Sequence, residues 1–331
     1  MGFMPYRAEL LLRKVAQRLP DFSARKLRTP AQFRARYFAD VPVDLSALKY
    51  CRAEHLPESG PVPWLDRDDA EEQIQRRIDS GALSEEQALD CRTFSRDGYV
   101  IFERLFPESL LDRCWNAYEA AIARGRIKLR ADAARAGDSL PGRHLNTHEP
   151  VPELREMLAY RPLLQRLEML IGRPPIPYQT ITSHKGSQQR AHSDAIHMTT
   201  YPNGYLTAAW IAFEDIHADS GPLFYYPGTQ RLPYVFCHHL GMAPGEFEKI
   251  GYDAVIAKHY EPKIQAQLKA GRFPRKTLLA RKGDVLVWHN NLIHGGARRR
   301  DLALTRKALV CHYYTRGAVC YHDLSGYRER L

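Results

Sequence analysis

Two short stretches of the chain carry residues that could bind a metal. Residues 190–197 contain His192 and Asp194, and residues 288–296 contain His294. Alternate side chains of a strand project from the same face, so His192 and Asp194 would lie side by side. A third ligand would complete a facial set. Two imidazoles and a carboxylate on one face of an iron leave the opposite face open for O2 and a co-substrate, as a non-haem Fe(II) oxygenase requires. We choose His294 as the third ligand.

The His-x-Asp pattern alone is weak evidence, because such a tripeptide also arises by chance. His197 is the main competitor, since His192 and His197 could form a ligand pair instead. An aspartate beside His192 on the same strand face fits better. We interpret the more distant histidines, His238, His239 and His259, as polar surface residues.

The surrounding sequence predicts a series of short strands. Residues 205–215 are typical of a buried strand, and the Gly and Pro residues at 220–223 and 227–231 predict turns. Residues 282–288 form a further turn and strand that would deliver His294 just beyond its end. Residues 306–314 predict one more strand. Short strands with Gly/Pro turns after residue 176, preceded by helices, favour a β barrel with flanking helices.

This order of features resembles the phytanoyl-CoA dioxygenase family of Fe(II)- and 2-oxoglutarate-dependent oxygenases. The resemblance rests on five separate motifs, which are His192-x-Asp194, the Trp210 strand, Gly-Pro followed by Pro-Gly-Thr, Gly-Asp-x-x-x-Trp-His before His294-Gly295-Gly296, and the segment from Arg306 to Leu309. It extends from about Phe94 to about Tyr314. The fold that it implies is mainly β with flanking helices (α+β). We expect a double-stranded β-helix, a jelly-roll (cupin-like) barrel of eight core strands, flanked by helices at 85–124 and 151–171.

The resemblance also implies the cofactors, which are Fe(II), 2-oxoglutarate as co-substrate, and O2. Arg306 matches the family's arginine for the distal carboxylate of 2-oxoglutarate, and a planar guanidinium is suited to bind a carboxylate in bidentate fashion. The alternative, a solvated surface arginine, fits Arg298, Arg299 and Arg300 better. Gln179 aligns with a family amide that contacts 2-oxoglutarate, and Trp210 is either a cofactor wall or a core residue. Relatives often carry a hydroxyl residue where this chain has Gly296.

The reaction that the resemblance implies is oxidation of an organic substrate coupled to conversion of 2-oxoglutarate to succinate and CO2. Halogenases of this superfamily replace the ligand carboxylate by a small residue, whereas Asp194 is present here. We therefore expect hydroxylation of an unactivated C–H bond, with desaturation, cyclisation or epimerisation as variants. A non-catalytic jelly-roll scaffold or binding protein is the alternative from another class.

The chain of 331 residues suffices for one large or two small domains. We expect a helical, basic N-terminal extension at 1–93 that packs on the barrel and an oxygenase domain at 94–331, with a lid-like insertion at about 232–276. Six cysteines without Cys-x-x-Cys spacing, and no visible signal peptide, favour a cytoplasmic protein with reduced thiols. It should be a monomer or a homodimer.

The formal net charge of +10 favours anionic partners. Much of it lies between Arg7 and Arg36, beside apolar residues at near-helical spacing. This amphipathic helix should dock on the barrel, although weak contact with a membrane surface is an alternative. No nucleic acid is expected, because the chain has no aromatic-interleaved basic motif. A polar or anionic small-molecule substrate is suggested by residues close to the metal motifs, namely Lys185, Arg190, Tyr201, Asn290 and Asn291.

Overall fold

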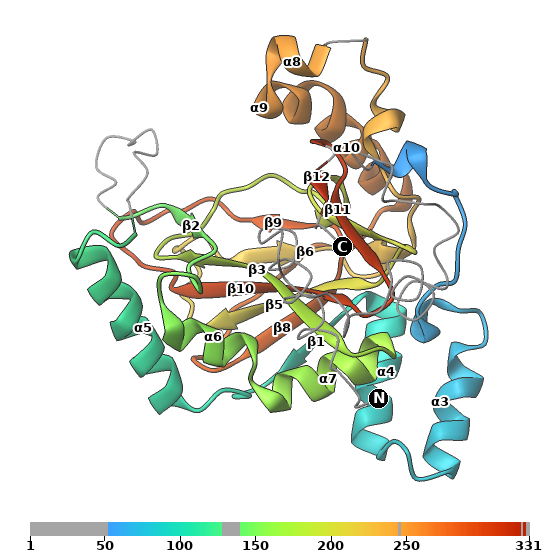
Figure 1. The fold of residues 1–331 in the computed structure, drawn as a ribbon, viewed down its shortest axis with the longest axis horizontal. Helices are drawn as coiled ribbons and strands as arrows, with labels where there is room; N and C mark the ends of the chain where they lie inside the picture. Colours follow the sequence, from blue (N-terminus) through green and yellow to red (C-terminus); the bar gives the residue numbers. More distant parts are fainter. Residues whose placement is uncertain (1–51, 128–139, 244–245, 326, 329–331) are drawn as a thin grey trace, which may run out of the picture.

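The computed structural model describes residues 52–127, 140–243, 246–325 and 327–328. In these residues a six-stranded antiparallel sheet has the order β1-β8-β5-β10-β3-β2, and two three-stranded sheets have the orders β7-β6-β9 and β12-β11-β4 (Figure 1). The strands of the large sheet are β1 (Tyr99–Phe102), β2 (Arg143–Leu145), β3 (Pro175–Ser183), β5 (Leu206–Ala212), β8 (Val285–His289) and β10 (Ala308–Thr315). Those of the small sheets are β4 (Thr199–Tyr201), β6 (Leu223–Tyr225), β7 (Lys276–Thr277), β9 (His294–Gly296), β11 (Val319–His322) and β12 (Tyr327–Arg328).

The alternation along β5 shows how the large sheet separates two cores. Ala208 and Trp210 point to an interior cluster that includes Leu223 of the small sheet β7-β6-β9. Ala209 and Ile211 point the other way, into the cluster formed with the helices. Both faces of the strand are therefore covered, and all seven of its residues are buried. This two-faced arrangement confirms the predicted jelly-roll barrel with flanking helices.

Helices cover the outer face of the large sheet. They are α3 (Ala70–Asp79), α4 (Glu85–Asp97), α5 (Glu108–Ala123), α6 (Pro152–Leu158) and α7 (Arg161–Ile171). The predicted start of α4 is confirmed, because Ser84 accepts a hydrogen bond from the backbone N–H of Gln87 and the Gln87 side chain accepts one from the N–H of Ser84. The positive φ of Gly98, 77°, ends this helix and lets the chain turn directly into β1.

The single helix expected at 151–171 is wrong in detail, because the chain forms two helices there. Pro162 lies in the first turn of α7 and has no N–H to donate to the carbonyl of Leu158, so α6 cannot continue through it. The second helix ends at Ile171, as predicted, because Gly172 follows it in a left-handed conformation (φ 79°). Pro175 is the first residue of β3.

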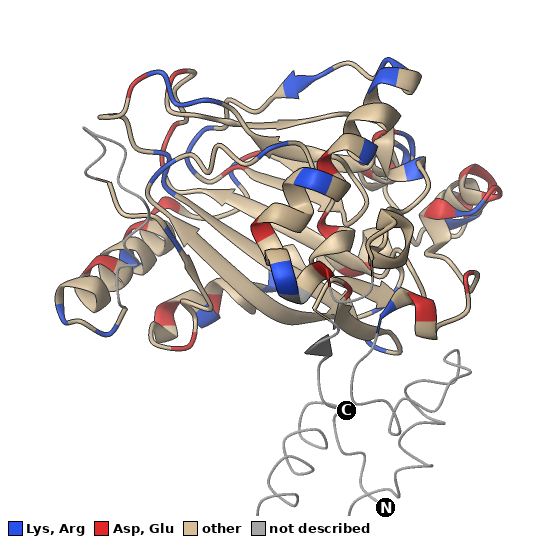
Figure 2. Ribbon diagram, turned by 90° about the horizontal axis from the view of Figure 1, so that it is seen from above, with Lys and Arg blue, Asp and Glu red and all other residues tan. Residues whose placement is uncertain are grey.

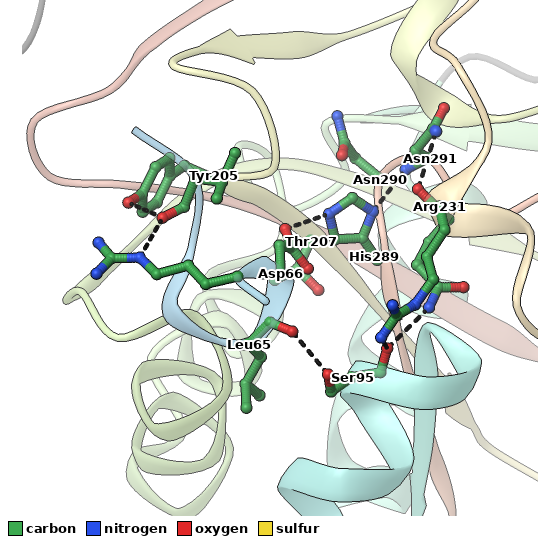
Figure 3. A network of polar contacts seen from close by, with 12 residues as sticks. Leu65, Asp66, Ser95, Tyr205, Thr207, Arg231, His289, Asn290 and Asn291 are labelled. Carbon is green, nitrogen blue, oxygen red and sulfur yellow. Dashed lines mark hydrogen bonds and ion pairs between the residues drawn. The ribbon is translucent and has the colours of Figure 1, made fainter. Parts of the chain in front are cut away.

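The described residues before α4 pack against the elements that follow them. Trp64 and Leu65 are buried in the same apolar cluster as the helices α4 to α7. Figure 3 shows the polar contacts beside them. The Ser95 hydroxyl donates a hydrogen bond to the carbonyl of Leu65 (2.7 Å), and the Asp66 carboxylate is hydrogen-bonded to Nε2 of His289 (3.2 Å). The basic run from Arg7 to Arg36, with its predicted amphipathic helix, lies outside the described residues.

The segment expected to form a lid contains several short helices. They are η7 (Cys237–Leu240), α8 (Glu246–Ile250), α9 (Tyr252–Val255), a π-helical turn η8 (Ile256–Tyr260) and α10 (Glu261–Gly271). The helices α8 to α10 lie on the opposite side of the barrel from α5 to α7 (Figure 1). Their buried residues share a cluster with Ala191 and Ile196 of the His-x-Asp segment and with Ile293. The insertion therefore packs against both metal-motif segments.

Charged residues are distributed over the outside of the described structure. In Figure 2, Lys and Arg occur beside Asp and Glu on several helices, and the barrel strands are mostly uncharged. None of the helices in the described ranges combines the length and the apolarity that crossing a lipid bilayer needs.

Candidate metal centre

The structure brings His192, Asp194 and His294 together. One possible ligand atom from each lies within 4.8 Å of the others, and the three residues are buried, at 7%, 6% and 6% exposure. The Oδ1 atom of Asp194 is 3.9 Å from Nε2 of His192 and 3.7 Å from Nε2 of His294. Two imidazole nitrogens and a carboxylate oxygen at this spacing suit a divalent transition metal.

A pair of backbone hydrogen bonds joins the two motifs across a hundred residues. The N–H of His192 donates to the carbonyl of His294 (2.9 Å), and the N–H of His294 donates to the carbonyl of His192 (2.8 Å). The two histidines therefore lie directly opposite each other as the paired residues of one antiparallel bridge. The expectation that Asp194 continues a strand is wrong, because it begins the 3-10 turn η5 (Asp194–Ile196). Ser193 is still extended (φ −99°, ψ 153°), which brings the two side chains of the His-x-Asp pair close together.

Backbone carbonyls orient both imidazoles. Nδ1 of His192 lies 2.8 Å from the carbonyl of Arg190, and Nδ1 of His294 lies 2.9 Å from that of Leu292. Since a carbonyl can only accept, each Nδ1 carries the proton and each Nε2 keeps a lone pair for a metal. Burial, aided by the nearby His294 and His197, holds the pKa of His192 well below its usual range, which keeps it in the neutral, metal-binding form.

The carboxylate of Asp194 is held by two residues whose role sequence reasoning did not assign. The indole N–H of Trp288 donates to Oδ2 (2.9 Å), and Nε2 of His312 lies 3.7 Å from the same oxygen. Burial raises the pKa of Asp194, but the imidazoles of His294, His312 and His192 outweigh burial and hold the pKa below its usual range. The Gly-Asp-x-x-x-Trp-His motif contained a signal for Trp288. His312 lies on β10 and had no such signal.

His197 lies near the centre but outside the ligand group found in the described residues. Its ring centroid is 5.4 Å from that of His192. Its Nδ1 atom is hydrogen-bonded to the hydroxyl of Tyr252, which belongs to α9 of the insertion. His197 therefore connects the insertion to the metal segment.

Arg306 lines the same cavity as the three candidate ligands. Its side chain is 5% exposed, has no carboxylate partner among the described residues, and leaves Nε without a hydrogen bond. One guanidinium nitrogen donates to the carbonyl of Gly221 (3.3 Å). Burial, with Arg143 and Arg299 adding to it, lowers the pKa of Arg306 to about 10, so it stays cationic at neutral pH. A buried cation without an acidic partner is suited to bind an anionic ligand.

The other predicted cofactor residues have different positions. Trp210 both joins the interior core and lines the cavity, with its ring centroid 5.8 Å from the guanidinium carbon of Arg306. Gln179 is half-buried on β3, whereas the cavity is lined by Ile181 and Ser183, further along the same strand. The assignment of Arg299 to the solvated surface is wrong. It is 3% exposed, and one of its guanidinium nitrogens donates to the carbonyl of Leu302 (2.6 Å).

Most residues that suggested a polar substrate have structural partners. The Asn291 amide donates to two backbone carbonyls, those of Gln230 and Leu232, and Arg190 pairs with Glu261 (2.8 Å). Besides His312, the polar cavity residues to which sequence reasoning gave no role are Arg143, Ser183, Ser187 and Gln189. Ser183 is the last residue of β3, and Ser187 and Gln189 lie between β3 and His192. No sequence motif distinguished these three residues.

Two histidines, an aspartate and a buried arginine line one cavity inside a jelly-roll barrel, and this set of side chains suits an Fe(II)-dependent oxygenase. The chain belongs to the phytanoyl-CoA dioxygenase (PhyH) family, which matches residues 94–308. The peroxisomal phytanoyl-CoA dioxygenase of Mus musculus is 26% identical over 277 residues, covering 77% of this chain and 75% of the relative. The Homo sapiens protein of the same name is 24% identical over 278 residues, covering 77% and 75%.

Solved structures share the fold. The non-haem α-ketoglutarate-dependent carbocyclase SnoK from nogalamycin biosynthesis superimposes with a TM-score of 0.54 at 19% identity, covering 74% of this chain and 88% of SnoK. EctD from S. alaskensis with bound Fe gives a TM-score of 0.51 at 19% identity, covering 70% and 77%. The protein is accordingly an Fe(II)- and 2-oxoglutarate-dependent oxygenase, and its donor set fits that metal and that dicarboxylate.

Proposed function

We propose that His192, Asp194 and His294 bind Fe(II), that Arg306 binds the distal carboxylate of 2-oxoglutarate, and that the enzyme hydroxylates a C–H bond of a small polar or anionic molecule. One observation carries the proposal. The three candidate ligands line a single cavity with Arg306, a buried arginine that has no acidic partner in the described part of the chain. Iron and 2-oxoglutarate together supply the oxidising chemistry.

The protein's own contribution is to position charges and to exclude water. Trp288 donates a hydrogen bond to one oxygen of the Asp194 carboxylate, near the imidazole of His312, and the other oxygen faces the two histidines. The interior cluster around Trp210 closes the inner end of the cavity with apolar side chains. The Asp194 carboxylate would occupy the coordination position that a halide needs in a halogenase. Its presence therefore favours hydroxylation over halogenation.

The expected polarity of the substrate rests on Arg143. This residue lies on β2 and lines the cavity beside Gln189, whose side-chain oxygen accepts a hydrogen bond from it (2.8 Å). Among the described residues Arg143 has no carboxylate partner. Arg143 is exposed and contacts a neutral amide, so it can exchange that bond for a stronger one to an anionic group. Arg143 therefore supports a substrate that carries a carboxylate or a phosphate.

The outcome of the reaction depends on which substrate atom faces the iron. Structures with this fold include the carbocyclase SnoK and the epimerase SnoN, so the barrel alone does not specify hydroxylation. Mass analysis of the product distinguishes the outcomes. Hydroxylation adds one oxygen atom to the substrate, desaturation and cyclisation remove two hydrogens, and epimerisation leaves the mass unchanged.

An anaerobic titration tests the proposed cofactor site. Fe(II) with 2-oxoglutarate should produce the weak visible charge-transfer band of the chelate in the wild-type protein. His294→Ala should abolish the band, because it removes one of three protein bonds to the metal. His197→Ala is the matched control and should retain the band. Loss of the band in His197→Ala with retention in His294→Ala would show that the ligand set is wrong, and no band in the wild type would favour a binding protein without this chemistry.

A further inference from the structure

The backbone at Gly296 leaves no room for a side chain. Gly296 is the second residue after His294. A Cβ atom built on it would lie 2.4 Å from Oγ of Ser187 and 2.8 Å from the backbone nitrogen of Gln188. Both distances are far below van der Waals contact, so a larger residue would displace the loop that carries Ser187. In this chain a hydroxyl from another segment already occupies the space beside position 296.

The same loop packs against Arg306. The backbone N–H of Arg306 donates to the carbonyl of His184 (2.7 Å). Its guanidinium donates to the carbonyl of Gly221, and a Cβ atom on Gly186 would be only 2.5 Å from that carbonyl oxygen. The backbone at Gly186 therefore packs directly against the acceptor of the guanidinium. Ser187 follows immediately, and it lines the cavity together with Arg306.

The hydroxyl of Ser187 has a proton to donate. Its oxygen accepts a hydrogen bond from the backbone N–H of Gln189 (3.3 Å). It donates to no acceptor among the residues that the structure describes. By contrast, the hydroxyl of Ser183, which lines the same cavity, donates to the carbonyl of Lys185 (2.6 Å). Ser187 is thus the serine of this cavity whose proton is still available.

We propose that the Ser187 hydroxyl donates a hydrogen bond to the distal carboxylate of 2-oxoglutarate beside Arg306. The inference rests on the proposed function of this cavity. A carboxylate offers about four lone-pair sites and the guanidinium fork uses two of them, so an additional donor has an acceptor available. Gly296 is then required, because any side chain there would move the donor away.

The test compares two keto acids on Ser187→Ala. Anaerobic titration of the iron-loaded protein gives the dissociation constants of 2-oxoglutarate and of 2-oxobutyrate, which lacks the distal carboxylate. Loss of a hydrogen bond to a charged group should weaken 2-oxoglutarate binding by about tenfold or more. Binding of 2-oxobutyrate and of Fe(II) should change little, because neither involves the missing bond.

The results separate this inference from the function on which it rests. Unchanged 2-oxoglutarate affinity in Ser187→Ala would overturn the inference while the wild-type chelate still supports the cofactor site. An equal loss for both keto acids would also overturn it, since it would show that Ser187 only supports the shape of the loop. Absence of the chelate in the wild-type protein would overturn the proposed function and this inference together.

Discussion

Replacing Arg306 by lysine keeps a positive charge but removes the planar fork that can bind both oxygens of a carboxylate. Losing one of two charge-assisted hydrogen bonds should cost about 1.5–3 kcal/mol, or about tenfold to a hundredfold in affinity for 2-oxoglutarate. The side chain is only 5% exposed, so water can replace little of the lost interaction. The effect should therefore lie toward the upper end of this range.

Burial adds a pH dependence to this variant. Burial, with Arg143 and Arg299 adding to the effect, lowers the pKa of Arg306 to about 10. The guanidinium therefore stays charged at neutral pH. A lysine begins from a lower pKa, about 10.4, and the same surroundings lower it too. Because a cation is lost as pH rises through its pKa, 2-oxoglutarate binding to Arg306→Lys should weaken as pH rises above neutrality. Wild-type binding should change much less.

Titration of 2-oxoglutarate against the anaerobic iron-loaded proteins measures both effects. Arg300→Lys is the appropriate control, because the Arg300 side chain is 78% exposed, whereas Arg299 is buried next to the site. If Arg306→Lys and Arg300→Lys bound 2-oxoglutarate with equal affinity at neutral pH, the assignment of Arg306 would be refuted. Arg143 or Arg299 would then be the cation that holds the distal carboxylate.

Two further variants test how the metal ligands are held. Trp288→Phe removes the hydrogen bond to Asp194 but keeps an apolar ring, and it should weaken Fe(II) binding by about tenfold to a hundredfold in an equilibrium titration. An unchanged iron affinity would mean that the indole only fills space. Tyr260→Phe removes a buried hydroxyl that accepts a hydrogen bond from the backbone N–H of Ser193 (2.9 Å). This change should lower the free energy of unfolding by about 1–3 kcal/mol. It should also weaken Fe(II) binding. Tyr252→Phe, from the same insertion, should affect iron less, and the opposite order would contradict this role for Tyr260.

The sequence by itself determined the features that depend on neighbours along the chain. The pairing of Ser84 with Gln87 at the start of α4 is such a feature, because capping involves residues three apart. The closeness of His192 and Asp194 is another, since one extended residue between them suffices. The order of strands and turns around these motifs, with the family resemblance, was enough to predict the barrel. The local predictions that were wrong, such as the single helix across Pro162, concerned where helices and strands begin and end.

Only the tertiary structure decided which distant residues support the centre. The approach of His294 to His192 depends on backbone hydrogen bonds between segments a hundred residues apart. The contact of His312 with Asp194 depends on strand register. The position of the Ser187 hydroxyl beside Gly296 depends on loop packing. Arg299 was misjudged because three consecutive arginines look equally solvated in sequence, whereas the packing against Gly221 buries the middle one. Such contacts leave no periodic or short-range pattern, because the partners are set by the folded chain and not by spacing along it.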